Sequence, residues 1–343
     1  MDELTLLREM LEIYSPSGEE GELAKYLVAQ MRELGFRAYQ DRAGNAIGVM
    51  GEGEKEILLL GHADTVAGFV PIRLEGNRLY GRGAVDAKGP LATFILAAAR
   101  VGSLTNKRLV VVGAVGEETM SKGAQCLLDE FSPEYVIVGE PSGWESVTLG
   151  YKGRLLVSYR LAAPVRHSSA EGASASERAV EFWGRLVGYA QGFNRGERWR
   201  FHTLDPTLHR IASAGNGFEE EVTMTITLRV PFGLDVPALK EQMRQWAEGA
   251  AVGFSGEDVP FKAPKNTPLV RVFLRAIRAQ EGQPTFKLKL GTSDMNTVGP
   301  VWKCPIVAYG PGDSSLDHTP GEYLDLAEYQ RAIAVLAQVL GAL

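Results

Sequence analysis

The stretch of sequence that most constrains the fold is residues 57–66, ILLLGHADTV. Its apolar run, 57–60, ends at Gly61, and such a short run is typical of a central strand of a parallel sheet that is buried on both faces. His62 follows directly and is expected where open α/β sheets bind their ligands, beyond the carboxyl ends of the strands. Asp64 is placed to accept the second ring N–H of a metal-bound imidazole and so to fix its tautomer.

Acidic side chains follow other expected strands, with no basic residue beside them. Strands are expected at 109–115 and 135–138, and each is followed by an acid. A further strand at 305–309 leads through a glycine-rich turn to a histidine. One more acid precedes an apolar helix expected at 91–101. Carboxylates gathered in a partly dry site would repel each other strongly unless cations lay between them. The sequence therefore predicts a site for one or two divalent metal ions, although each glutamate taken singly reads as a solvated loop residue. The residues concerned are Asp86, Glu117, Glu118, Glu140 and His318.

Five motifs, GHADTV, GRGAVDAKG, GEE, GEP and DHTPGEY, occur in this order and span nearly the whole chain. They resemble the di-zinc amidohydrolase and exopeptidase family of acetylornithine deacetylase, succinyl-diaminopimelate desuccinylase, aminoacylase and carboxypeptidase G. Within this family the chain looks closest to hydrolases that release lysine or ornithine from an amino-group carrier protein in lysine and arginine biosynthesis. This last likeness rests on overall similarity and on no single residue.

The resemblance implies a set of ligands for two Zn²⁺ ions per subunit, which Co²⁺ can replace because both metals accept the same nitrogen and oxygen ligands. Asp86 would bridge the two ions. His62 and Glu140 would complete one metal site, and Glu118 and His318 would complete the other. Histidine and carboxylate ligands without thiolates are typical of catalytic zinc sites, which keep a position open for water.

The resemblance also implies the catalytic groups of an amide hydrolase. Glu117 would be the general base that activates a metal-bridging water, because neighbours in an extended turn point to opposite sides and leave Glu118 free to bind metal. His167 matches a histidine of the family's inserted domain that reaches the active site of the partner subunit, where it would stabilise the oxyanion; this implies a homodimer. Ala170 and Glu171 replace a common proline here, so a surface-loop histidine remains an alternative.

Substrate contacts are implied by two further matches. Arg229 matches the family's carboxylate-binding arginine, and its forked guanidinium suits the α-carboxylate of an amino acid; the alternative is a surface charge at the end of a strand. A Gly-Thr-Ser-Asp stretch resembles the family's pocket loop, although by itself it would be only a turn. The family also holds the bond after the bridging Asp in cis, so a cis Asp86–Ala87 bond is expected. The pocket residues are Thr292, Ser293 and Asp294.

The order of expected elements predicts two domains. Alternating helices and strands indicate a doubly wound, mostly parallel α/β sheet, which would form a discontinuous metal-dependent catalytic domain of residues 1–152 and 259–343. The pattern in between suggests the β-α-β-β-α-β order of a ferredoxin-like α+β domain, inserted as a lid and dimerisation domain of residues 153–258. Within the catalytic domain, Ser17 and Glu20 form a capping-box pattern that is expected to start a helix.

Composition excludes several classes of protein. The net charge of −6 and the lack of a basic run argue against nucleic-acid binding. No apolar run approaches the about 20 residues of a membrane span, and the acidic N-terminal segment does not resemble a secretory signal. Cys126 and Cys304 are the two cysteines of the chain, so a disulfide framework is not expected and a reducing cytoplasm is favoured.

Three functions remain open from the sequence. The leading one is hydrolysis of the amide that joins the terminal glutamate of an acidic carrier protein to lysine or ornithine, with docking helped by arginines of the inserted domain. The second is a small-molecule deacylase acting on N-acetylornithine or N-succinyl-diaminopimelate. The third is a non-catalytic metal-binding scaffold of the same fold, which predicts loss of the base or of a ligand. The arginines are Arg195, Arg198, Arg200 and Arg210, which taken alone read as a solvated face.

Overall fold

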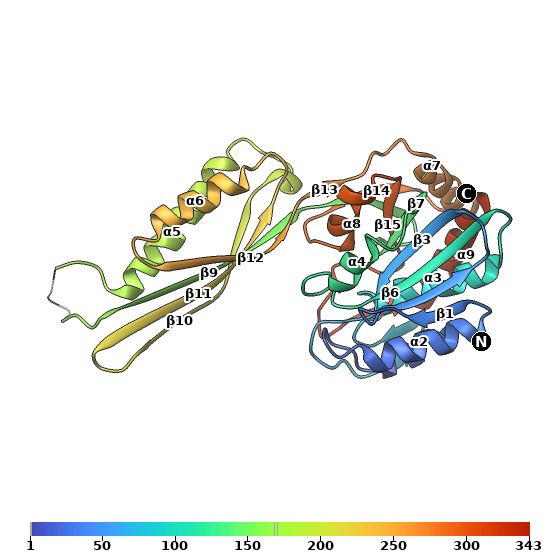
Figure 1. Ribbon diagram of the computed structural model, residues 1–343, viewed down its shortest axis with the longest axis horizontal. Helices are drawn as coiled ribbons and strands as arrows, with labels where there is room; N and C mark the ends of the chain where they lie inside the picture. Colours follow the sequence, from blue (N-terminus) through green and yellow to red (C-terminus); the bar gives the residue numbers. More distant parts are fainter. Residues whose placement is uncertain (1, 168, 170) are drawn as a thin grey trace. The chain divides into compact units, whose positions relative to one another are not determined.

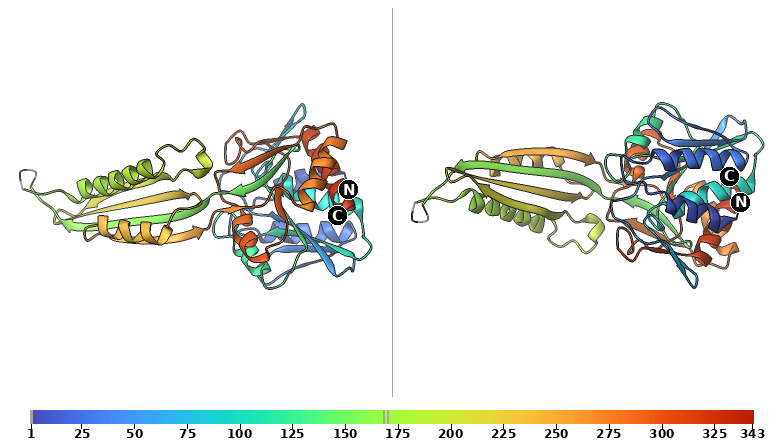
Figure 2. Two further views of the ribbon diagram at one scale, coloured as in Figure 1. Left: turned by 90° about the horizontal axis from the view of Figure 1, so that it is seen from above. Right: turned by 90° about the horizontal axis from the view of Figure 1, so that it is seen from below.

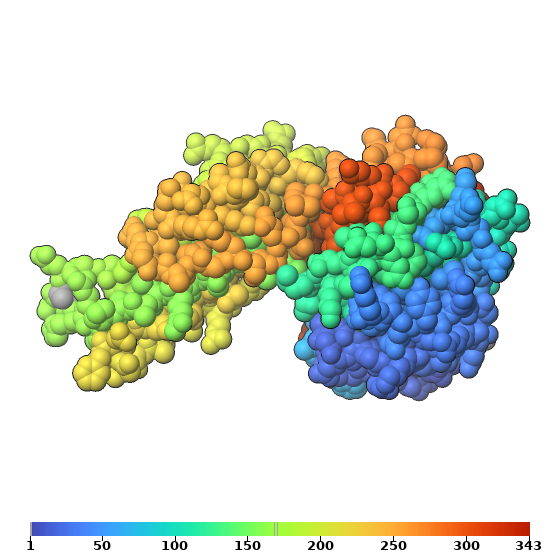
Figure 3. Space-filling view, in the orientation of Figure 1, coloured from blue at the N-terminus to red at the C-terminus, as the bar shows by residue number. Residues whose placement is uncertain are grey.

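The computed structural model describes residues 2–167, 169 and 171–343, which form two compact units. Unit 1 comprises the described residues up to Gly150 together with Phe261–Leu288 and Ser293–Leu343. Unit 2 comprises Tyr151–Pro260 and Lys289–Thr292. Both chain ends lie in unit 1 (Figure 1), and the N-terminal segments, blue in Figure 3, form part of its surface.

A mixed sheet with parallel central strands forms the core of unit 1. Its strands are β1 (Arg37–Gln40), β2 (Ala46–Met50), β3 (Lys55–His62), β6 (Lys107–Ala114), β7 (Tyr135–Gly139), β8 (Ser146–Tyr151), β13 (Phe261–Lys262), β14 (Thr285–Lys289) and β15 (Ile306–Tyr309). Strands β6, β3, β7 and β15 lie side by side and run parallel, whereas β2 and β8 pair with them in antiparallel orientation. The carboxyl ends of the parallel strands therefore meet at one edge.

Helices cover this sheet, and two of them share a face. The helices of unit 1 are α1 (Glu3–Glu12), α2 (Gly21–Glu33), α3 (Lys88–Val101), α4 (Lys122–Leu127), α7 (Pro268–Ala279), α8 (Asp294–Trp302) and α9 (Leu326–Ala342). The side chains of Leu27 in α2 and Leu91 in α3 both lie over Gly113 of β6. The largely apolar α3 is buried between the sheet and α9. A small sheet of β4 (Arg73–Glu75), β5 (Arg78–Tyr80) and β16 (Tyr323–Asp325) lies outside the main one.

Unit 2 has the expected β-α-β-β-α-β order. Its elements are β9 (Gly153–Pro164), α5 (Ala175–Phe193), β10 (Asp205–Gly215), β11 (Glu219–Val230), α6 (Val236–Trp246) and β12 (Ala251–Asp258). The strands form an antiparallel sheet in the order β10-β11-β9-β12. Helices α5 and α6 run along the strands (Figure 2) and bury the apolar face of β11. The sequence did not locate β10, because this edge strand is largely exposed and lacks apolar alternation.

The predicted capping box at the start of α2 is wrong. The helix begins at Gly21, and its N-cap makes no side-chain capping bond. The Ser17 hydroxyl instead donates to the Asp64 carboxylate at 2.7 Å, and Glu20 accepts the N–H of Gly116 at 3.1 Å. Both side chains bind partners distant in sequence, which a local pattern cannot reveal. Among the described residues, no helix combines the length and the apolar character needed to cross a membrane.

Candidate metal centre

Three of the predicted ligands converge at the carboxyl edge of the sheet. The Nε2 atom of His318 lies 2.9 Å from Glu118 Oε1 and 3.1 Å from Asp86 Oδ2. One ligand atom from each residue lies within 4.8 Å of the other two. Asp86 precedes α3, Glu118 follows β6 and His318 follows β15, so the fold brings together residues that are far apart in sequence.

His62, the last residue of β3, joins this group through Asp86. Its Nε2 atom lies 3.1 Å from Asp86 Oδ1, so the two oxygens of Asp86 each face a different imidazole. A carboxylate with a histidine beside each oxygen has the arrangement that a bridging ligand between two cations requires. The peptide bond between Asp86 and Ala87 is cis, as expected.

Asp64 makes a different contact from the one predicted. The Nδ1 atom of His62 lies 2.9 Å from the backbone oxygen of Asp64 and 3.6 Å from its carboxylate. The carboxylate instead accepts the N–H groups of Glu117 and Glu118, each at 3.0 Å, and the hydroxyl of Ser17. The nearest acceptor of the imidazole is therefore the backbone carbonyl of Asp64, whereas the carboxylate holds the Glu117–Glu118 turn by accepting its N–H groups.

Glu117 lies among other acids. Desolvation raises the pKa of Glu117 well above its usual value; His62 opposes this shift, and the charges of Glu140, Asp294 and Glu118 add to it. A carboxyl with a raised pKa can both accept and return a proton near neutral pH. The Glu117 carboxyl is therefore suited to transfer a proton.

The histidines show how strongly the acids attract positive charge. Hydrogen bonds to Asp86 and Glu118 raise the pKa of His318 to about 10. For His62, burial lowers the pKa, but Asp64 and Asp86 raise it more, and the net shift is well upward. The negative charge of these carboxylates would be compensated by a cation. Imidazole nitrogens and carboxylate oxygens that converge are also the donors that a divalent metal ion such as zinc accepts.

Glu140 lies outside the three-residue group found among the described residues. It follows β7 and is buried, and its N–H donates to the carbonyl of Tyr309 at 3.3 Å. Its carboxylate is near enough to Glu117 to raise that residue's pKa. Glu140 therefore borders the centre from the neighbouring strand end.

The predicted substrate residues divide between the units. In unit 2, Arg229 Nη1 donates to the hydroxyl of Thr292 at 3.4 Å. In unit 1, Ser293 caps α8 by accepting a backbone N–H, and Asp294 is buried close enough to Glu117 to affect its pKa. Helix α8 was not predicted, because the Gly-Thr-Ser-Asp stretch reads locally as a turn.

His167 belongs to unit 2 and is exposed. Its Nδ1 atom lies 2.6 Å from the hydroxyl of Ser169 and accepts the N–H of that residue. Of the two residues, Ala170 and Glu171, that depart from the family pattern, position 170 lies outside the described residues. The catalytic role of His167 stays a prediction.

Residues 58–342 match the description Peptidase family M20/M25/M40. The chain belongs to this family. It is 44% identical over 344 residues to the [LysW]-lysine hydrolase of Deinococcus radiodurans, covering 98% of this chain and 95% of the relative. It is 42% identical to a putative [LysW]-lysine/[LysW]-ornithine hydrolase of Pyrococcus abyssi, covering 99% of this chain and 93% of the relative. The resemblance seen in the motifs is confirmed.

Solved structures of M20 proteins share the fold. The metallo-carboxypeptidase Sso-CP2 of Sulfolobus solfataricus has a TM-score of 0.78 at 18% identity, with 99% of each chain covered. The YXEP protein of Bacillus subtilis, described as a dinuclear metal binding peptidase, has a TM-score of 0.66 at 14% identity, with 99% of this chain and 97% of that chain covered. The predicted α/β class is confirmed.

Sequence reasoning missed Glu322, which supports the centre of this M20 chain. Its fully buried carboxylate accepts the N–H groups of Val85 and Asp86, at 2.9 and 3.1 Å, and pairs with Arg82 at 2.6 Å. It thereby joins the segment that carries His318 to the segment that carries Asp86. Its place within the DHTPGEY motif is the signal that could have drawn attention to it, but the sequence does not indicate its partners.

Lys88 is a second residue that the sequence did not single out. Its buried ammonium group donates to the carbonyl oxygens of Met10 and Ile13, at 3.0 and 2.7 Å. Burial lowers the pKa of Lys88 to about 7. The residue ties the start of α3, two positions after Asp86, to the end of α1.

Proposed function

We propose that this protein hydrolyses the amide bond between lysine, or ornithine, and the terminal glutamate of an acidic amino-group carrier protein of the LysW kind, in lysine or arginine biosynthesis. The observation that carries the proposal is identity of 42–44% to relatives named for this activity, over nearly the full length of both chains. Membership of a peptidase family and the convergence of Asp86, Glu118 and His318 support metal-dependent amide hydrolysis.

The ligand set proposed for two divalent ions is His62, Asp86, Glu118, Glu140 and His318. Zinc, with cobalt(II) as a substitute, suits these nitrogen and oxygen donors. When bound, such ions polarise a carbonyl group and lower the pKa of a shared water toward ~7. Asp86 is proposed as the ligand common to both ions, since its oxygens face His62 and His318.

The chain's own residues would transfer the proton. Glu117 accepts the proton of the attacking water as the water oxygen bonds to the carbonyl carbon, and returns it to the amine nitrogen as the carbon–nitrogen bond breaks. Two backbone contacts of the Asp64 carboxylate, to Glu117 and Glu118, hold this turn in place. The upward shift of the Glu117 pKa suits a group that must hold the proton between these steps.

Residues of both units are proposed to bind and orient the substrate. Arg229 is proposed to bind the α-carboxylate of the amino acid, with Thr292, Ser293 and Asp294 lining the pocket. His167 is proposed to reach the active site of the partner subunit in a homodimer and to stabilise there the oxyanion that forms on the substrate. Unit 1 would be the catalytic domain and unit 2 the lid and dimerisation domain, acting in the cytoplasm without nucleic acid or membrane.

Unit 2 carries exposed arginines whose positive charge is opposite to that of an acidic carrier. Exposed arginines there would speed encounter with an acidic protein through complementary potential. Glu197 and Asp205 lie in the same segment, so this charge is locally offset. The exposed residues are Arg195, Arg198, Arg200 and Arg210.

A direct competition tests the proposal. Metal-loaded enzyme is given equal concentrations of carrier charged with lysine and of N-acetylornithine, and the released amino acids are measured by mass spectrometry. We expect faster release of lysine from the carrier, and release about 10²–10⁴-fold slower from the Glu117→Gln variant. Faster cleavage of N-acetylornithine would replace the proposal with a small-molecule deacylase.

A further inference from the structure

Two loops of unit 1 carry proposed metal ligands and lie side by side. The first, called here the Glu140 loop, is residues 140–144 after β7. The second, the His318 loop, is residues 310–318 after β15. Strands β7 and β15 are parallel neighbours, so the loops leave the sheet at the same edge.

The two loops are in close contact near the sheet. The N–H of Ser142 donates to the carbonyl of Gly310 at 3.1 Å. A side chain at Gly310 would meet the carbonyl oxygen of Glu140 at 2.8 Å, so this approach needs glycine. The backbone positions of Glu140 and of the His318 loop are therefore coupled.

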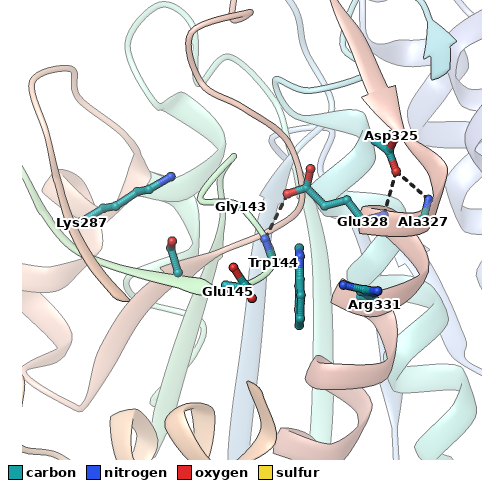
Figure 4. Close-up of a pocket in the computed structure, with 9 residues that line it drawn as sticks. Gly143, Trp144, Glu145, Lys287, Asp325, Ala327, Glu328 and Arg331 are labelled. Atoms are coloured by element: carbon teal, nitrogen blue, oxygen red, sulfur yellow. Dashed lines mark hydrogen bonds between the residues drawn. The ribbon is translucent and has the colours of Figure 1, made fainter. Parts of the chain in front are cut away.

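Farther from the sheet, a single carboxylate oxygen holds both loops. Glu328 Oε1 accepts the N–H of Trp144 and the N–H of Gly312, each at 3.0 Å. The contact to Trp144 is drawn in Figure 4. Gly312 has a φ of 105°, which favours glycine and aims its N–H at α9. Glu328 thus connects the end of the Glu140 loop to the start of the His318 loop.

Glu328 makes these contacts in place of a local one. Asp325 caps α9 by accepting the N–H groups of Ala327 and Glu328. An acid at this third helical position commonly reaches back to the N-cap N–H in a capping box. Here it reaches outward to the N–H groups of the two loops.

Further contacts fix Trp144, the partner of Glu328 on the first loop. The Tyr309 hydroxyl donates to the carbonyl of Trp144 at 2.8 Å, and the Arg331 guanidinium lies 4.9 Å from the centre of its ring. Trp144, Glu328 and Arg331 line a cavity of about 470 Å³ (Figure 4). Trp144 thus keeps its contacts to Tyr309 and Arg331 when Glu328 is removed, but it loses the acceptor that it shares with Gly312 of the His318 loop.

We propose that Glu328 is a positioning residue of the metal centre, which fixes the placement of Glu140 relative to His318. This inference rests on the proposed role of both residues as ligands. Removing the carboxylate leaves the N–H groups of Trp144 and Gly312 without their acceptor, and the loops can then move apart. Direct hydrogen-bond partners of metal ligands typically change metal affinity by about 10–100-fold, and Glu328 acts through the loops that carry the ligands, so we expect the lower end of this range.

The test compares metal binding by Glu328 variants that differ in reach. Chelated protein is titrated with zinc by calorimetry, and the visible absorption of the cobalt(II) form reports ligand geometry. We expect E328A to bind metal at least about tenfold more weakly, with an altered cobalt spectrum. E328Q keeps an acceptor oxygen at the same place, so it should stay close to the wild type.

Glu145 provides a matched control from the same cavity. Its carboxylate also accepts a backbone N–H, from Gln283 at 3.1 Å, but touches neither ligand loop through that contact. E145A should keep the affinity and the cobalt spectrum of the wild type. A merely structural role for Glu328 would lower the melting temperature of E328A and leave both metal readouts unchanged, which would overturn the inference.

A third variant keeps the test decisive if E328A does not fold. E328D retains the charge but is one methylene shorter, so one oxygen cannot reach both N–H groups; wild-type affinity in folded E328D would refute the inference. The readout needs no substrate. Weakened metal binding in E328A therefore supports the inference even if carrier-bound lysine is not cleaved, and unchanged binding refutes it even if carrier-bound lysine is cleaved.

Discussion

Replacing Asp64 by asparagine separates two roles that one carboxylate could play. In the structure the carboxylate binds the N–H groups of Glu117 and Glu118 through different oxygens, each at 3.0 Å, while His62 contacts the backbone oxygen. Asparagine keeps the shape and the backbone carbonyl but offers a single acceptor oxygen. D64N should therefore disturb the Glu117–Glu118 turn and leave the contact to His62 in place.

The magnitude follows from the bonds that are lost. One of the two N–H groups would face an NH2 group, which loses a charge-assisted hydrogen bond and leaves a buried donor unpaired, together about 3–5 kcal/mol of unfolding free energy. Displacing Glu117 by about 1 Å would lower kcat by about 100-fold. Burial raises the pKa of Asp64, but His62, Ser17 and the N–H of Glu118 lower it more. Since the folded pKa is depressed, this stabilisation is present above the unfolded pKa and is lost as the pH falls through the folded value.

Urea unfolding and lysine release would be measured on D64N beside a matched control. Asp235 also accepts a backbone N–H, from Ala238 at 2.9 Å, as the N-cap of α6 in unit 2. D235A should lose about 1 kcal/mol of unfolding free energy and keep kcat, whereas D64N should lose both stability and kcat. Wild-type stability in D64N together with loss of bound metal would refute the reasoning, because it would mean that the carboxylate acts mainly on His62, 3.6 Å away, and not on the Glu117–Glu118 turn.

The remaining predictions concern the base, the buried acid and the metal. E117Q should retain zinc in calorimetry while turnover falls by about 10²–10⁴-fold, because the proton acceptor is gone; turnover equal to the wild type would exclude Glu117 as the base. E322Q breaks a buried pair with Arg82 and should lower the free energy of unfolding in urea by about 3–5 kcal/mol. The exposed pair of Arg160 and Glu221 gives the control, since solvent screens it and E221Q should cost far less; equal losses would contradict this account of Glu322. Chelation should lower the melting temperature, since metal at 100 times its Kd stabilises by about 2.7 kcal/mol; an unchanged melting temperature would argue against a metal bound to the folded state.

The parts of the fold that the sequence predicted are those with local signals. The apolar run before His62 indicated a buried parallel strand, and β3 is flanked by parallel β6 and β7. Alternation in residues 221–230 indicated the buried face of β11, which packs on α5 and α6. Such signals suffice because the period of a strand or helix is written in neighbouring residues.

The parts that the sequence missed depend on partners from distant segments. Ser17 and Glu20 fit a capping box, but Asp64 and Gly116 provide stronger partners across the fold. Glu322 lies 236 positions from Asp86, whose N–H it accepts. No local pattern reports a hydrogen bond of that range, so the ligands could be predicted but the residues that hold them in place could not.

Anomalous diffraction from crystals of the zinc-loaded protein tests the central claim most directly. The account predicts two peaks that share Asp86, one beside His62 and Glu140 and the other beside Glu118 and His318. Peaks elsewhere, or no zinc near Asp86, would contradict it.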